Sequence, residues 1–313
     1  MSRIHEALKK AEQERAAMGA SAEAIAPAEE QFRPAANESA PQANPPAAAG
    51  GSVPLMAGMP SFSSPFTVEA LLARCSPQPW TPDEKTMLFF NADESARGTE
   101  EFRTLRSRLY QAREKAPLKK LLITSSLPKE GKSFTAANLA QVLVRQHERR
   151  VLLIDGDLRN PSLHMKLGTT AMPGLADYLE GRTDEFSIMQ RGPMENLFFI
   201  ASGKQAPNPA DLVGNGRVKL LLQRVENLFD WVILDSPPAV PVSDASVLAN
   251  ACDGVLLVVR SSATPVDMAR RARLEFPPES VVGVVLNGTN HEAIRYQRYY
   301  YEEYQKNGSQ SKT

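Results

Sequence analysis

The sequence has little cysteine, no net charge and no long apolar run, and each absence excludes a class of protein. Its 313 residues contain only two cysteines, Cys75 and Cys252, so a disulfide framework is not indicated and a reducing compartment is expected. Its 36 basic side chains balance its 36 acidic ones, which gives no bulk electrostatic case for binding nucleic acid or an anionic membrane. No apolar run approaches the roughly 20 residues that cross a bilayer, and the start lacks the apolar core of a signal peptide. We therefore expect a cytoplasmic protein.

Composition divides the chain into four parts. Residues 1–18 show an apolar stripe among charges, which predicts a short amphipathic helix. The stripe consists of Ile4, Ala7, Leu8 and Ala11. Because so short a helix is marginal alone, docking on a partner and a solvated tail both stay open. Residues 19–66 are rich in Ala and Pro and predict a disordered linker, residues 67–290 predict the folded domain, and residues 291–313 form a tyrosine-rich tail.

Apolar strands alternate with helical patterns between residues 67 and 290. The predicted strands cover 121–124, 151–155, 197–201, 231–235, 255–259 and 281–286, with 87–90 as a possible seventh. The predicted helices cover 68–75, 98–114, a stretch from about 134, 174–179 and 216–227. Such alternation predicts an α/β fold of the P-loop NTPase type, an open and mostly parallel sheet with helices on both faces. Its ligand is expected at the carboxyl ends of the strands.

The turn after the predicted strand 121–124 contains Gly131-Lys132-Ser133, the end of a P-loop pattern. In such a loop, backbone N–H groups and a helix N-terminus surround phosphate oxygens, the lysine reaches the β/γ-phosphates and the serine hydroxyl contacts Mg²⁺. The first glycine of G-x-x-x-x-G-K-[ST] is Ser126 here, so the bare pattern is incomplete. A nucleotide site is predicted, and a chance Gly-Lys-Ser at a helix start is the competing interpretation.

Carboxylates follow two of the predicted strands. Strand 151–155 ends at Asp155 with Asp157 two residues later, and strand 231–235 ends at Asp235. The carboxyl ends of buried parallel strands share one edge of a sheet, so we expect these acids beside the P-loop. The pattern does not decide whether they organise magnesium and its water or accept a proton.

Two further patterns lie outside the predicted nucleotide site. Glu100, Arg103 and Arg106 share one face of the predicted helix 98–114, and their spacing alone favours a solvated, salt-bridged surface. The tail holds five of the seven tyrosines in a polar segment with few aliphatic residues, Tyr296, Tyr299, Tyr300, Tyr301 and Tyr304. Their hydroxyls should be accessible, and an aromatic patch for a partner protein is the alternative.

With these motifs in order, the sequence resembles the bacterial tyrosine kinases (BY-kinases) of capsule and exopolysaccharide systems, in their stand-alone cytoplasmic form (CpsD/CapB type). The resemblance covers roughly residues 100–304. The family loop S-x-x-P-x-E-G-K-[ST] matches residues 125–133, although Lys129 stands where the family usually has glycine. The family's Asp-x-Asp-x-Arg motif matches residues 155–159, and its third motif matches residues 232–235.

The resemblance implies a role for each candidate residue. Nucleotide contacts would come from Ser126, Pro128, Lys129, Glu130, Gly131, Lys132, Ser133, Phe134 and, toward adenine, Asn287. Magnesium would be held by Ser133, Asp157 and Asp235, and catalysis would involve Asp155 as the tyrosine-activating base together with Lys132 and Asp157. Glu100, Arg103 and Arg106 match the family's oligomerisation motif, and the five tail tyrosines match its autophosphorylation cluster.

The implied function is an ATP- and Mg²⁺-dependent protein-tyrosine autokinase that regulates exopolysaccharide or capsule polymerisation and export. The implied partners are further copies in a ring and the cytoplasmic segment of a membrane chain-length-determinant protein. No nucleic acid is expected, and contact with the inner face of the cell membrane would come only through that partner.

Two other classes stay open. A partition- or division-site-type ATPase shares the fold but usually carries a signature lysine where this loop has Leu127, and it has no tyrosine tail. A non-catalytic, nucleotide-dependent scaffold would not need Asp155.

Overall fold

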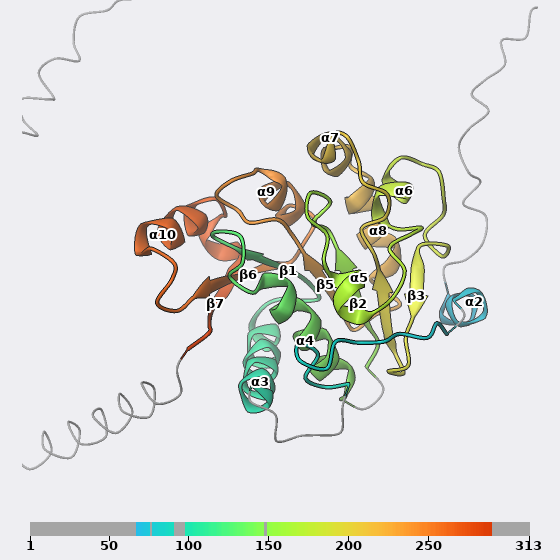
Figure 1. The fold of residues 1–313 in the computed structure, drawn as a ribbon, viewed down its shortest axis with the longest axis horizontal. Helices are drawn as coiled ribbons and strands as arrows, with labels where there is room; N and C mark the ends of the chain where they lie inside the picture. The colour runs from blue at the N-terminus through green and yellow to red at the C-terminus, as the bar shows by residue number, and fades with distance from the viewer. Residues whose placement is uncertain (1–66, 76, 91–97, 147–148, 290–313) are drawn as a thin grey trace, which may run out of the picture. The chain divides into compact units, whose positions relative to one another are not determined.

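The computed structural model describes residues 67–75, 77–90, 98–146 and 149–289 (Figure 1), all of them in the unit Phe62–Thr313. The predicted helix 1–18, the linker 19–66 and the tyrosine tail lie outside the described residues and stay predictions. Within the described ranges, no helix is both long and apolar enough to cross a membrane.

A seven-stranded sheet in the order β3-β4-β2-β5-β1-β6-β7 forms the centre of the domain. Its strands are β1 (Lys120–Ser125), β2 (Val151–Asp155), β3 (Met189–Arg191), β4 (Leu197–Ile200), β5 (Trp231–Asp235), β6 (Gly254–Arg260) and β7 (Val281–Asn287). Every pairing is parallel except that of β3 with β4. The predicted mostly parallel α/β sheet is confirmed.

Helices cover both faces of the sheet (Figure 1). They are α2 (Val68–Arg74), α3 (Thr99–Lys115), α4 (Lys132–Val144), α5 (Leu163–Leu167), α6 (Leu175–Leu179), α7 (Pro209–Gly214), α8 (Arg217–Val225), α9 (Asp244–Ala249) and α10 (Val266–Leu274), with a 3₁₀ turn, η1 (Pro278–Ser280). Because successive strand residues face opposite sides, Leu121 and Ile123 join the core under α3 and α4, whereas Leu122 joins the core under α6 and α8. Burial on both faces explains why the central strands are apolar throughout rather than alternating.

The prediction of a possible strand at residues 87–90 is wrong. This stretch forms turns, with Met87 and Phe89 buried against α4. Its backbone is paired by side chains instead of a neighbouring strand: Asn138 Oδ1 accepts from the Leu88 N–H at 2.8 Å, and Gln141 Oε1 accepts from the Phe89 N–H at 3.1 Å. A short apolar segment that packs against a helix can therefore have the composition of a strand.

The topology brings three strand ends together. β1 lies between β5 and β6, and β2 pairs with the other side of β5, so Asp155 stands directly opposite Asp235 in the register. The P-loop follows the adjacent end of β1 at Ser125. The carboxyl edge of β2, β5 and β1 thus places the two acids beside the turn into α4.

Candidate active site

The turn between β1 and α4 has the backbone of a phosphate-binding loop. Gly131 caps α4 with a φ of 101°, and Lys132 and Ser133 open the helix. A Cβ at Gly131 would lie 2.0 Å from Asn287 Nδ2, so glycine is required there for space as well as for its positive φ. The free N–H groups of the first helical turn are suited to an anion.

Several residues predicted to contact nucleotide also support the loop itself. Glu130 is buried, and its Oε2 accepts from the Leu127 N–H at 2.9 Å. Asn287 Nδ2 donates to the Glu130 carbonyl at 2.9 Å. Phe134 packs edge-on against Phe102 of α3, with ring centroids 5.8 Å apart. These contacts fix the shape of the loop around whatever it binds.

The remaining predicted loop residues differ in exposure. Pro128 and Lys129 are exposed at the tip of the turn. Ser126 is buried, and its hydroxyl has no hydrogen-bond partner among the described residues. A buried donor in a phosphate-binding loop needs an explanation, and a bound ligand would provide one.

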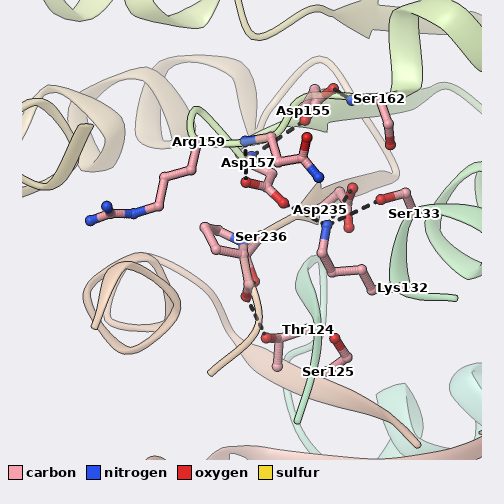
Figure 2. A network of polar contacts seen from close by, with 12 residues as sticks. Thr124, Ser125, Lys132, Ser133, Asp155, Asp157, Arg159, Ser162, Asp235 and Ser236 are labelled. Atoms are coloured by element: carbon pink, nitrogen blue, oxygen red, sulfur yellow. Dashed lines mark hydrogen bonds and ion pairs between the residues drawn. The ribbon is translucent and has the colours of Figure 1, made fainter. Parts of the chain in front are cut away.

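Lys132 lies among the strand-end acids (Figure 2). Its Nζ is 2.7 Å from Asp157 Oδ2, 3.2 Å from Ser133 Oγ and 3.6 Å from Asp235 Oδ2. Burial acts to lower the pKa of Lys132, but Asp235 and Asp157 outweigh it and the pKa is raised. The lysine is therefore firmly cationic, as a phosphate ligand must be.

Asp155 is fully buried at the end of β2. Its Oδ2 accepts from the Ser162 and Leu163 N–H groups at 3.2 and 3.0 Å, and its Oδ1 accepts from the Asp157 N–H at 3.3 Å. Burial and the neighbouring Asp235 carboxylate outweigh these bonds and raise the pKa of Asp155 to about 7. A carboxylate with this pKa is matched to proton transfer near neutral pH.

Asp235 is the second fully buried acid, and neither of its oxygens has a hydrogen-bond partner among the described residues. Burial raises its pKa, and Lys132 acts in the opposite direction. A buried carboxylate that lies 3.6 Å from the Lys132 ammonium and has no hydrogen bond to a described residue suits a hard cation. Within the described ranges, no three His, Cys, Asp or Glu side chains form a metal-binding group by themselves. Mg²⁺ at a nucleotide site usually takes only one or two carboxylates and completes its shell with phosphates and water, so this donor set fits it.

The Asp-x-Asp-x-Arg motif is anchored by a residue that sequence reasoning missed. Arg159 makes two charge-assisted hydrogen bonds to buried Asp244 at the start of α9, at 2.8 and 3.0 Å. This pair fastens the segment after β2 to a neighbouring helix. Asp244 gave no sequence signal because it lies beyond the Ser236-Pro237-Pro238 turn, well past the end of β5.

Glu100, Arg103 and Arg106 lie on α3, and none of them is brought into the strand-end cluster. Arg103 pairs with Glu100 on the exposed side of the helix. Arg106 instead donates to the Val142 carbonyl of α4 at 3.1 Å. The predicted oligomerisation motif thus includes one residue with an internal structural role.

The sheet order, the loop before α4 and the acids at the neighbouring strand ends define a protein of the P-loop NTPase type. No protein-family model matches the chain. The chain is 36% identical over 192 residues to the tyrosine-protein kinase YwqD of Bacillus subtilis, covering 61% of this chain and 81% of the relative. Its fold is similar to the kinase domain of the Escherichia coli tyrosine kinase ETK, with a TM-score of 0.59, 31% identity and coverage of 64% of this chain and 80% of that one. A chimerical protein named CapA2B2 is similar with a TM-score of 0.61, 26% identity and coverage of 71% and 97%. The chain belongs to the bacterial tyrosine-protein kinases, and the predicted family and enzyme class are confirmed.

Proposed function

We propose that this kinase transfers the γ-phosphoryl group of Mg·ATP to tyrosines of its own tail, as an autokinase of capsule or exopolysaccharide production. The observation that carries the proposal is the convergence of Lys132, Asp155 and Asp235 beside the loop that opens α4. ATP follows from membership of a kinase family, and the donor chemistry around Asp235 supports magnesium.

Each residue of the site has a distinct task. Loop N–H groups and Lys132 bind and orient the phosphates, which neutralises charge on the group in transfer. Ser133, Asp157 and Asp235 would hold Mg²⁺, directly or through water, and the bound ion would supply further charge neutralisation on the phosphates. Asp155 accepts the tyrosine hydroxyl proton at its carboxylate, which matters because a tyrosine near pKa 10 is a poor nucleophile at neutral pH.

The tail is the proposed acceptor because the two other tyrosines are engaged in the fold. Tyr178 is buried, and the Tyr110 hydroxyl accepts from Trp231 Nε1 at 3.2 Å. The full chain incubated with Mg²⁺ and γ-radiolabelled ATP should therefore incorporate label. A variant with phenylalanine at all five tail tyrosines should lose at least nine-tenths of it, while a Tyr110→Phe control keeps it. Label undiminished in the five-phenylalanine variant would place the acceptor elsewhere.

We further propose a ring of subunits joined through Glu100 and Arg103, activated by the cytoplasmic segment of a membrane chain-length-determinant protein. The similarity to the chimerical protein CapA2B2 supports association of the kinase with a second polypeptide. A tail entering a neighbouring subunit's site would make assembly a condition for transfer.

Arg103→Glu should convert an oligomer formed by the wild type into a folded monomer in light scattering. Arg106 is not used for this test because its bond to the Val142 carbonyl also supports α4. Arg108→Glu, at an exposed position of the same helix, is the matched control. A wild type that stays monomeric at high concentration, with ATP and the partner segment present, would refute the interface.

A further inference from the structure

Arg260 and Thr264, which lie at and just after the end of β6, both contact the P-loop. Neither residue belongs to the loop motif. Arg260 ends β6, and Thr264 lies in the turn before α10. The Arg260 guanidinium donates through Nη1 to the Lys129 carbonyl at 3.1 Å. The Thr264 hydroxyl bonds the Glu130 carboxylate and accepts from the Arg260 N–H at 3.1 Å. We call these four residues the loop clamp.

The loop clamp contacts Lys129, the residue of the loop with an unfavourable backbone conformation. Lys129 has a φ of 66°, in the left-handed region, which costs a residue with a Cβ several-fold in population relative to glycine. Its side chain is exposed at the loop tip, so side-chain burial does not impose this conformation. The Arg260 bond to the Lys129 carbonyl is a long-range contact that can do so.

The second half of the clamp fixes the following peptide. Glu130 is only 3% exposed, and its two carboxylate oxygens have separate partners, the Leu127 N–H on the loop and the Thr264 hydroxyl on the next turn. A buried carboxylate whose two oxygens are both hydrogen-bonded holds the two bonded groups at a fixed separation. The loop is therefore hydrogen-bonded at two adjacent residues, Lys129 and Glu130, to the end of β6 and the turn that follows it.

We propose that Arg260 is a positioning residue for nucleotide binding: it stabilises the left-handed Lys129 and, with Thr264 and Glu130, sets the loop N–H groups for the phosphates. This inference rests on the proposed function in assuming that the loop binds Mg·ATP. It differs from a direct role in which the Arg260 guanidinium would touch the nucleotide itself.

A double-mutant cycle separates the two roles. In the full chain, Arg260→Ala should raise the Kd of Mg·ATP measured by calorimetry about 5- to 10-fold, and should raise KM for ATP with kcat changed less than about twofold. Glycine adopts the left-handed region without steric cost. In a Lys129→Gly background, the same Arg260→Ala change should therefore raise Kd less than about twofold relative to its own parent. Arg270→Ala, on the exposed side of α10, is the control and should leave Kd unchanged.

Thr264 provides an independent arm. Thr264→Ser keeps the hydroxyl and should bind Mg·ATP like the wild type, whereas the isosteric Thr264→Val should raise Kd by about the same factor as Arg260→Ala. An equal loss from Arg260→Ala in the wild-type and the Lys129→Gly backgrounds would overturn the proposal and assign Arg260 to the nucleotide itself. Equal Kd values of Mg·ATP for Thr264→Ser and Thr264→Val would also overturn the proposal.

Urea unfolding without nucleotide keeps this test separate from the proposed function. The clamp predicts that Arg260→Ala destabilises the wild type more than it destabilises the Lys129→Gly variant, by about a fivefold difference in the unfolding constants. If the wild type fails to bind Mg·ATP, the proposed function fails and the unfolding cycle alone decides the clamp. Additive effects in that cycle would overturn it.

Discussion

Asp155→Asn should lower phosphorylation of the tail about 10²- to 10⁴-fold, the range typical of losing a general base. Mg·ATP affinity should stay within about threefold, because the three hydrogen bonds that Asp155 accepts come from backbone N–H groups outside the loop, those of Asp157, Ser162 and Leu163. Rates come from quantitative phosphotyrosine detection on the full chain, and affinity comes from calorimetry.

The same substitution should stabilise the protein without ligand, and this effect should depend on pH. Because the folded pKa of Asp155 is raised from 3.8 to about 7, the folded state binds the extra proton and stability falls as pH rises through that window. At about 1.4 kcal/mol per pKa unit, and with the repulsion shared by Asp235, the Asp155→Asn variant should gain about 1–3 kcal/mol at pH 8. The gain should shrink as pH falls toward 4.

Exposed Asp267→Asn serves as the control and should change neither phosphorylation nor the pH dependence of unfolding. If Asp155→Asn keeps phosphorylation within tenfold of the wild type, the base lies elsewhere. A stability gain equal at pH 5 and pH 8 would contradict the raised pKa.

Lys132→Met should weaken Mg·ATP binding at least about 100-fold. The substitution removes the cation that lies 2.7 Å from Asp157 and 3.6 Å from Asp235, so no lysine at the start of α4 remains to attract the β/γ-phosphates. It also leaves buried carboxylates without their counter-charge, and breaking a buried pair typically costs about 3–5 kcal/mol. Unfolding in urea at pH 8 should show a loss of this order, smaller at pH 5 where the acids take up protons.

Lys204→Met, at an exposed position, is the control for a lost lysine and should bind Mg·ATP like the wild type. ATP affinity unchanged by Lys132→Met would remove the loop from the nucleotide site. Unchanged affinity together with a large stability loss would give Lys132 a purely structural role.

Local sequence was sufficient for the features that repeat along a parallel sheet. An apolar strand followed by an acid predicted β2 with Asp155 and β5 with Asp235, and Gly131-Lys132-Ser133 predicted the start of α4. These succeed because a strand buried on both faces has a composition of its own, and because a phosphate loop needs particular residue types at fixed spacing.

Sequence reasoning failed where a contact between distant segments decides the structure. Residues 87–90 have a strand-like composition, yet Asn138 and Gln141 of α4 satisfy their backbone. The antiparallel edge strand β3 is short and has no alternating pattern to identify it. Nothing near Glu130 in the sequence indicates that its carboxylate reaches Thr264, whereas its predicted contact with nucleotide stays a prediction.

One further sequence signal would have made Arg260 and Thr264 candidates for the edge of the site. Polar residues just past every parallel strand, and not only the acids after β2 and β5, are candidates for the site edge. Arg260 ends β6 and Thr264 follows it, so both are candidates of this kind. Which of them touches the loop still depends on the order β5-β1-β6, which only the folded sheet reveals.

The central claim is that the acceptor of the phosphoryl group is a tail tyrosine and not water. The most direct test incubates the full chain with Mg·ATP and the activating partner segment and makes two measurements on the same sample. Release of inorganic phosphate reports ATP hydrolysis, and mass spectrometry of the chain reports phosphotyrosine. We expect phosphate mainly between Tyr296 and Tyr304, and its loss in Asp155→Asn. Steady ATP hydrolysis with no phosphotyrosine anywhere in the tail would contradict the claim and indicate a partition-type ATPase.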